Sequence, residues 1–416
     1  MTFQDYRQVV VERFFKYVRF DTQSAEDSQT FPSTEGQKKF AQVLADELKK
    51  LGLSDVQVDK YGYVTATLEA NTSKSVPTIG FIAHMDTSPE VSGKNVKPIL
   101  HENYQGGDIC LSEKSGRILL ASENPDLQTQ IGHDIITSDG TTLLGADNKA
   151  GIAEIFTAIQ YLIEHPEIHH GRIRIAITPD EEVGQGTKYF DIKAFAADYA
   201  YTVDGESAGE VENETFCADS VTILFQGVNV HPGYAKGKLV NAIKIAAHFI
   251  EQLPKDKLSP ETTEKRQGYL HPHHIEGGVE NTTLKFLIRD FTVEGLKEKE
   301  TYLKNLASSV LNKYPKAKFE FKVEESYRNM KYKLDEDPKV VEYALEAVRR
   351  SGLKPKLSFI RGGTDGARLS YMGVLTPNLF TGGHNFHSNL EWISVQDMLK
   401  AVETIVNLVQ IWEEKA

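Results

Sequence analysis

The chain has 416 residues, of which 40% are hydrophobic and 25% charged, values typical of a globular protein with more than one domain. Its net charge of −12, without a long basic run, argues against nucleic acid or an anionic membrane as a partner. No apolar run is long enough to cross a bilayer, and the first residues lack the pattern of a signal peptide. We therefore expect a cytoplasmic protein.

Cysteine usage narrows the chemistry further. Cys110 and Cys217 are the only cysteines in the sequence. So few thiols in a chain of this length indicate a reducing compartment, and we expect both to be reduced. A metal site built from thiolates is excluded, so any metal must be bound by histidines and carboxylates.

The first part of the chain shows alternating helix and strand patterns. Apolar residues at helical spacing predict a helix over residues 3–19 and another that starts after Ser33 or Thr34 and ends before Gly52. Strands are expected over residues 56–58 and 63–68. The long segment 88–135 is rich in loops and gives no interpretable pattern.

An apolar run over residues 78–83 ends abruptly in His84 and Asp86. The run predicts a buried strand of an α/β sheet. Residues two apart in an extended chain point the same way, so the carboxylate of Asp86 suits the orientation of a metal-bound His84 ring. The pattern alone is weak evidence, because a histidine near a strand end is usually structural.

Four later segments carry acidic or histidine side chains in similar positions. Asp147 precedes a helix predicted over 152–163, Glu181 and Glu182 follow a strand over 172–178, Asp204 follows a strand over 199–203, and His387 follows a strand over 374–380. Ligands of open α/β sheets bind at the carboxyl ends of strands, so these side chains converge if the strands are parallel neighbours. Such a set fits a two-metal hydrolytic site, with zinc expected first and manganese or cobalt as substitutes.

Glu181 and Glu182 are adjacent in a turn and therefore point in different directions. One of them can bind metal while the other faces the substrate. Among packed carboxylates the free one is expected to have a raised pKa, which suits a general base. The alternative is that the pair is an ordinary solvated helix start.

The pattern changes between residues 217 and 326. Strands over 220–226, 282–291 and 318–324, helices over 239–253 and 296–314, and one further strand within 268–279 give the order βαββαβ, which is ferredoxin-like. We expect this segment to be an inserted domain. Residues 1–216 and 327–416 then form a discontinuous catalytic domain, with closing helices over 340–351 and 395–413.

Seven short segments together resemble the co-catalytic zinc peptidases related to aminoacylase and bacterial carboxypeptidases, and among them the tripeptide aminopeptidases. The segments are 83–87, 144–151, 178–184, 203–205, 231–233, 361–366 and 385–387. Any one is modest evidence, but the ordered set is specific and the match covers essentially the whole chain. The resemblance implies a mostly parallel, doubly wound α/β catalytic domain with two zinc ions, and an inserted α+β ferredoxin-like domain that acts as lid and dimerisation domain.

The resemblance also implies roles for individual residues. It implies two zinc sites that share Asp147, with the ligand sets His84, Asp147 and Asp204, and Asp147, Glu182 and His387. Glu181 would deprotonate the metal-bridging water and later protonate the leaving amine, and Asp86 would support His84. A cis peptide bond between Asp147 and Asn148 is expected as well.

Three further residues are candidates for binding the peptide. We expect His231 to stabilise the oxyanion in its own or a partner subunit's site, and Arg289 and Arg361 to offer bidentate forks to the C-terminal carboxylate. The alternatives are that His231 braces a turn and that Arg289 pairs with Asp290.

The sequence thus predicts a metallo-aminopeptidase that removes the N-terminal residue from tripeptides. A dipeptidase, a carboxypeptidase or an N-acyl amino acid deacylase on the same scaffold would use the same metal ligands, so those ligands cannot separate these activities. A catalytically inactive relative is a second alternative. It is disfavoured because Glu181 and all five predicted ligands are present.

Overall fold

The computed structural model describes residues 2–113 and 115–416. They form two compact units. The first lies within Met1–Asn213, Met330–Phe359 and Thr364–Ala416, and the second comprises Glu214–Asn329 with Ile360–Gly363. The last short segment differs from the predicted boundaries, because Arg361 donates hydrogen bonds to the carbonyl oxygens of Lys265 and Gln267 in the second unit.

The helices of the first unit follow the amphipathic patterns of the sequence. They are η1 (Phe3–Tyr6), α1 (Arg7–Tyr17), α2 (Glu35–Lys50), η2 (Pro125–Gln130), α3 (Ala146–Glu164), α4 (Ile192–Phe195), α7 (Lys331–Leu334), α8 (Lys339–Arg350), α9 (Asp365–Met372) and α10 (Val395–Glu414). Over the described residues, none of these or the other helices has the length and apolar character needed to span a bilayer.

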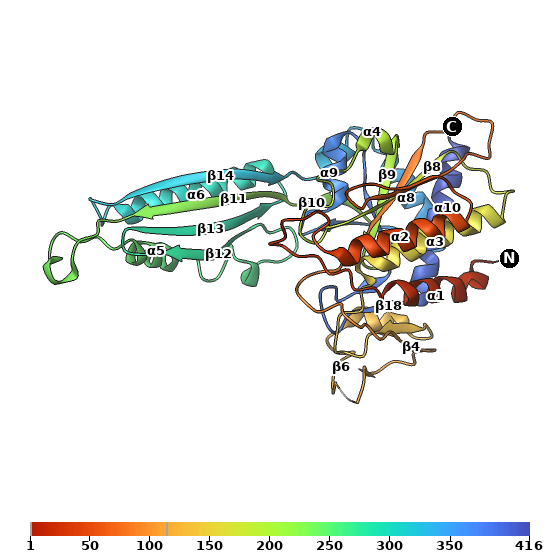
Figure 1. Ribbon diagram of the computed structural model, residues 1–416, viewed down its shortest axis with the longest axis horizontal. Helices are drawn as coiled ribbons and strands as arrows, with labels where there is room; N and C mark the ends of the chain where they lie inside the picture. The colour runs from red at the N-terminus through yellow and green to blue at the C-terminus, as the bar shows by residue number, and fades with distance from the viewer. Residues whose placement is uncertain (1, 114) are drawn as a thin grey trace. The chain divides into compact units, whose positions relative to one another are not determined.

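An eight-stranded sheet is the centre of the first unit (Figure 1). Its strands in spatial order are β1 (Ser54–Val58), β2 (Val64–Leu68), β8 (Ile173–Thr178), β3 (Ile79–His84), β9 (Tyr199–Gly205), β16 (Asn378–Phe380), β10 (Glu210–Thr215) and β15 (Lys356–Ile360). Strands β8, β3, β9 and β16 are parallel, whereas the pairs β1–β2, β2–β8 and β10–β16 are antiparallel. The sheet is therefore mixed rather than mostly parallel, and β10 was not predicted.

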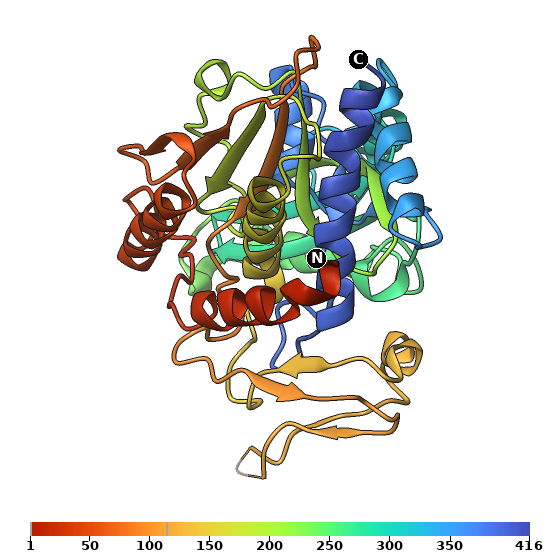
Figure 2. The same ribbon diagram turned by 90° about the vertical axis from the view of Figure 1, so that its right-hand side faces the viewer.

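Both faces of this sheet are covered, which explains why every residue of β3 and β8 is buried. On one face Phe81 stacks on Tyr201, whose hydroxyl accepts a hydrogen bond from Trp412 of α10. Figure 2 shows α1, α3 and α10 in front of the strands. On the other face Ile82 packs in a cluster with Phe195 of α4 and Leu369 of α9.

The loop-rich segment without an interpretable pattern contributes to two small sheets. One has the order β17 (Gly383–His384), β18 (Trp392–Ser394), β7 (Ile135–Thr137) and β4 (Ile99–His101), and the other pairs β5 (Ile109–Cys110) with β6 (Ile118–Leu119). Strands β17 and β18 flank the loop that carries His387. The antiparallel pairing of these two strands holds both ends of that loop together.

The second unit has the predicted order βαββαβ. Its elements are β11 (Cys217–Gln226), η3 (Pro232–Tyr234), α5 (Ala242–Glu251), η4 (Pro260–Thr262), β12 (Tyr269–Gly277), β13 (Asn281–Asp290), α6 (Val293–Leu311) and β14 (Lys318–Tyr327). The sheet order β12-β13-β11-β14 is fully antiparallel, and α5 and α6 cover one face of it (Figure 1). Alternate residues Val221, Ile223 and Phe225 enter the core beneath these helices.

Candidate metal centre

The four parallel strands bring the predicted ligands to one edge of the sheet. Strand β3 ends at His84, and β8 is followed by the turn that carries Glu181 and Glu182. The strands are in register, since His84 pairs with Thr178 of β8. Asp204 lies on β9, directly beside β3, so the predicted convergence of strand ends is confirmed.

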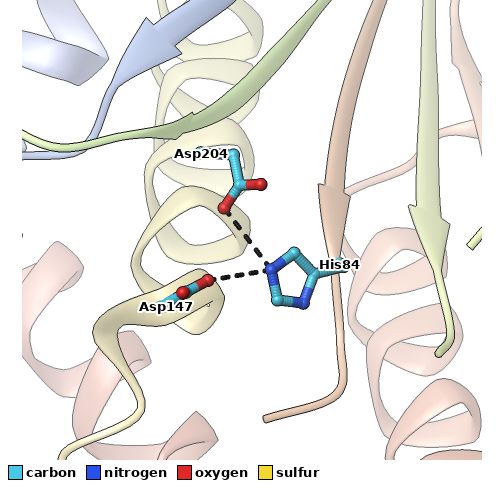
Figure 3. A group of neighbouring side chains, drawn as sticks. All are labelled: His84, Asp147 and Asp204. Carbon is cyan, nitrogen blue, oxygen red and sulfur yellow. Dashed lines mark hydrogen bonds and ion pairs between the residues drawn. The ribbon is translucent and has the colours of Figure 1, made fainter. Parts of the chain in front are cut away.

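Figure 3 shows the first group of ligands, in which two carboxylates meet one imidazole nitrogen. Nε2 of His84 lies 2.9 Å from Oδ1 of Asp147 and 3.4 Å from Oδ1 of Asp204. The candidate ligand atoms of these three residues all lie within 4.8 Å of one another. The His84 side chain is 3% exposed, so this group is closed to bulk water on the strand side.

A second group shares Asp147. Nε2 of His387 lies 3.2 Å from Oδ2 of Asp147 and 2.8 Å from Oε2 of Glu182. Asp147 thus directs one oxygen to each histidine, which is the arrangement of a carboxylate that can bridge two cations. His387 is 36% exposed, so solvent reaches the centre from its side.

Asp147 lies in a bend at the start of α3. Gly145 adopts the left-handed conformation with φ of 84°, and Asp147 and Asn148 depart from helical geometry. The predicted cis peptide bond between Asp147 and Asn148 is present. The regular helix therefore begins only after the ligand.

Asp86 is fully buried and contacts both the histidine and the acidic turn. Its Oδ1 lies 3.3 Å from Nδ1 of His84. Its two oxygens accept hydrogen bonds of 3.1 Å from the backbone N–H groups of Glu181 and Glu182. One carboxylate therefore orients an imidazole and fixes the turn that carries the two glutamates.

The histidines and Asp147 are electrostatically coupled. Burial alone would lower the pKa of His387, but hydrogen bonds to Asp147 and Glu182 raise it to about 11. The pKa of His84 is likewise raised, against burial, by Asp204 and Asp147. Burial opposes ionisation of Asp147, yet hydrogen bonds from both histidines lower its pKa.

The remaining carboxylates carry more negative charge than the site compensates. Burial and the charge of Asp147 raise the pKa of Glu182 to about 8, and burial raises that of Asp204 to about 6. Burial also raises the pKa of Glu181 well above its usual value, and Asp365, Asp204 and Glu182 add to this shift against the charge of His84. Oε1 of Glu182 is buried without a hydrogen-bond partner in the described part of the chain. A centre of histidine and carboxylate donors with excess negative charge fits divalent cations.

Two acids at the centre were not assigned a role from the sequence. Oδ2 of Asp365 accepts a 2.7 Å hydrogen bond from Thr178, at the end of β8. Glu391, which is 1% exposed, accepts hydrogen bonds from backbone N–H groups at the Asp147 bend. Asp365 follows a strand and a glycine-rich turn, so the strand-end pattern contained a signal for it. Glu391 had no such signal.

The three predicted peptide-binding residues lie in the second unit. Exposed His231 accepts a hydrogen bond at Nδ1 from the N–H of Gly233, so it braces the η3 turn. Arg289 donates to the carbonyl of Ile288 and lies over the ring of Tyr327. Arg361 donates to carbonyl oxygens of its own unit. A role of these residues in binding a peptide stays a prediction.

A family model described as Peptidase family M20/M25/M40 matches residues 139–411. The chain belongs to this family of peptidases. Peptidase T of Caldanaerobacter subterraneus is 54% identical over 406 residues, which are 98% of this chain and 99% of that protein. Peptidase T of Geobacillus kaustophilus is 50% identical over 410 residues, with 99% and 100% covered. The crystal structure of aminopeptidase PepT from Bacillus cereus superposes with a TM-score of 0.76 at 26% identity, covering 98% of this chain and 99% of that one.

Proposed function

We propose that the chain is a metallo-aminopeptidase that hydrolyses the N-terminal peptide bond of tripeptides. One observation carries the proposal: two groups of histidine and carboxylate ligands share Asp147 beside a free glutamate, Glu181. The likeness to peptidase T proteins over nearly the full length of the chain supports the tripeptide specificity. The family shown above supports the reaction class.

We propose two zinc ions as the cofactor, with manganese or cobalt as substitutes. His84, Asp147 and Asp204 would hold one ion, and Asp147, Glu182 and His387 the other. The donor chemistry and the uncompensated charge described above support this assignment. When bound, such ions supply Lewis acidity that polarises a carbonyl group and makes water a nucleophile near neutral pH.

In the proposed reaction Glu181 moves the protons. Its carboxylate removes a proton from the attacking water and then delivers it to the amine that leaves when the peptide bond breaks. The raised pKa of Glu181 favours the first step, because it makes the carboxylate a stronger base toward the attacking water. Asp86 keeps this side chain in place through the backbone N–H groups of the turn.

The second unit supplies the rest of the proposal. We propose that it serves as the lid and as the surface of a homodimer, that His231 stabilises the oxyanion, and that Arg289 and Arg361 bind the peptide's C-terminal carboxylate. A cytoplasmic location is also proposed, because Cys110 and Cys217 are both free.

Product analysis tests the proposal directly. Purified chain is incubated with Ala-Gly-Leu and with its N-acetylated form, in the presence and absence of a strong chelator. Release of alanine first from the free tripeptide, no cleavage of the acetylated one, and loss of activity with chelator are expected. Release of leucine first would indicate a carboxypeptidase, and cleavage of N-acetylated amino acids a deacylase. Hydrolysis that survives complete metal removal would refute the metallopeptidase.

A further inference from the structure

One carboxylate outside the two ligand groups holds the bend at which they meet. Oε2 of Glu391 accepts hydrogen bonds of 2.7 Å from the backbone N–H groups of Leu144 and Gly145. Its other oxygen, Oε1, accepts a 3.0 Å hydrogen bond from the N–H of Asp147 itself. Glu391 thus satisfies three backbone donors around the shared ligand from a distant part of the sequence.

Those donors would otherwise be buried and unpaired. The first N–H groups of a helix have no partner within it and are usually capped by a local side chain. The residue at the N-cap position of α3 is Gly145, which has no side chain to do so. Glu391 takes that place, and its three bonds hold a backbone segment that departs from helical geometry at Asp147.

The same glutamate closes the loop that presents His387. The amide of Asn385 donates a 3.1 Å hydrogen bond to the carbonyl of Leu390, and the N–H of Glu391 donates to the carbonyl of Ser388. The loop is therefore compact, and its last residue contacts the Asp147 bend. This connection fixes the loop that carries His387 against the backbone of Asp147. The two side chains meet there, with His387 Nε2 at 3.2 Å from Asp147 Oδ2.

We propose that Glu391 is a positioning residue for the metal centre: it sets the distance between the bridging carboxylate of Asp147 and the imidazole of His387. The inference rests on the proposed function and adds a residue to it. Glu391 belongs to neither ligand group. It acts through the backbone, by holding the second ligand group in a geometry that binds a cation.

Glu391→Gln tests this role with little change of shape. An amide offers one acceptor oxygen, and its NH₂ group would face either Asp147 N–H or the N–H groups of Leu144 and Gly145, donor against donor. We expect the weaker of the two Zn²⁺ affinities, titrated against a competing chelator, to fall at least about tenfold. The visible spectrum of the Co²⁺ form should change. The loss of activity should appear mainly as a lower kcat, with a smaller change in KM.

Glu123→Gln is the matched control. Glu123 is exposed and belongs to neither ligand group. The variant removes the same charge from the same unit, so it should leave Zn²⁺ affinity within about twofold. Equal losses in both variants would show a general charge effect and overturn the positioning role. So would native Zn²⁺ affinity in folded Glu391→Gln.

A shorter carboxylate keeps the test decisive if the glutamine variant does not fold. Glu391→Asp retains both acceptor oxygens but withdraws them by one methylene, so we expect a smaller loss of Zn²⁺ affinity. Native affinity in this variant would show that the placement of the two oxygens does not matter and would overturn the proposal. Failure of both variants to fold would assign Glu391 to folding and overturn it as well. Wild-type chain that binds Zn²⁺ without cleaving Ala-Gly-Leu would refute the proposed function while leaving the metal readout intact.

Discussion

Two neighbouring glutamates of the same turn differ in their surroundings. Glu182 meets His387 at 2.8 Å and belongs to a ligand group, whereas Glu181 is in no such group and has a strongly raised pKa. Their backbone N–H groups bind the same Asp86 carboxylate, which fixes both. Adjacent residues can therefore serve different steps because they leave the turn in different directions.

Substitution of Glu181 separates these roles. Glu181→Gln should lower kcat on Ala-Gly-Leu by about 10²- to 10⁴-fold, since a general acid–base group contributes that much. Bound zinc, measured by elemental analysis, should stay at the wild-type level. Glu182→Gln is the matched control and should lose zinc. Undiminished turnover in Glu181→Gln would show that the base is another group.

Among the candidate ligands, those that follow strands carry a local signal in the sequence. His84, Glu182 and Asp204 occupy positions where a buried run ends in a polar side chain, and that pattern is local. Glu391 could not be found in this way, because its partners are backbone groups of a distant segment. Nothing in the residues around Glu391 indicates which N–H groups it will meet.

At the scale of elements, the close approach of α3 to β9 brings Asp147 near Asp204. Gly151 lies in α3 where the helix crosses the end of β9. A Cβ atom there would overlap the carbonyl oxygen of Val203 and the side chain of Asn148. The absence of a side chain at this position lets a helix and a strand that carry ligands of the same group approach each other.

Gly151→Ala should therefore weaken both fold and metal binding. We expect the free energy of unfolding to fall by about 1–3 kcal/mol or more, as in overpacked cores, with a loss of Zn²⁺ affinity. Urea denaturation and metal titration measure the two effects. Gly278→Ala, where a Cβ meets nothing within 4 Å, is the control and should change neither. A Gly151→Ala protein as stable as wild type would contradict the packing argument.

Asn378 of β16 joins the strands on its two sides. Its Oδ1 accepts a 3.0 Å hydrogen bond from the N–H of Asp204 on β9, and its Nδ2 donates a 2.6 Å bond to Glu212 on β10. Burial raises the pKa of Glu212 to about 8, although this hydrogen bond opposes the shift. The folded chain therefore holds a proton on Glu212 that the unfolded chain releases near pH 4.5.

A raised carboxyl pKa makes stability fall as pH rises. The contribution of Glu212 is fully present below about pH 4.5 and is lost progressively up to about pH 8. Glu212→Gln keeps an acceptor for Asn378 but cannot ionise, so its free energy of unfolding should decrease less over that window and exceed the wild-type value at pH 8. Urea denaturation across the window measures this. As a control, Glu298→Gln at an exposed position should show the same change of unfolding free energy with pH as the wild type. If the Glu212→Gln curve ran parallel to the wild-type curve, the raised pKa of Glu212 would be refuted.

Whether a segment forms a helix or a strand was more predictable than which strands pair with one another. Helical spacing located α1, α2, α8 and α10, and the βαββαβ order of the second unit followed from alternation of strand and helix patterns. The mixed sheet was not foreseen, because a buried antiparallel strand has the same apolar pattern as a parallel one. Strands β4, β7, β17 and β18 are too short for any periodicity, and their pairing depends on contacts between distant segments.

At the scale of the whole molecule, the two units have separate cores, and among the residues that the structure describes only the first unit contains the candidate metal ligands. Zinc should therefore protect one unit selectively. Removing it with chelator should speed amide exchange in β3 and β9 and leave β11 and β13 unchanged, since a ligand at about a hundred times its Kd stabilises its fold by about 2.7 kcal/mol. Mass-detected exchange measures both sets of peptides together. Equal changes in both units would contradict the independence of the two cores.

Strand β16 lies between β9 and β10, although it follows them by many residues in the chain. During synthesis on the ribosome, β9 and β10 emerge long before the strand that separates them, and His387 emerges later still. A nascent chain can gather His84, Asp147 and Asp204 but cannot complete the second group. The second ligand group, on which the proposed reaction depends, is therefore complete only once translation has delivered the C-terminal segment that carries His387.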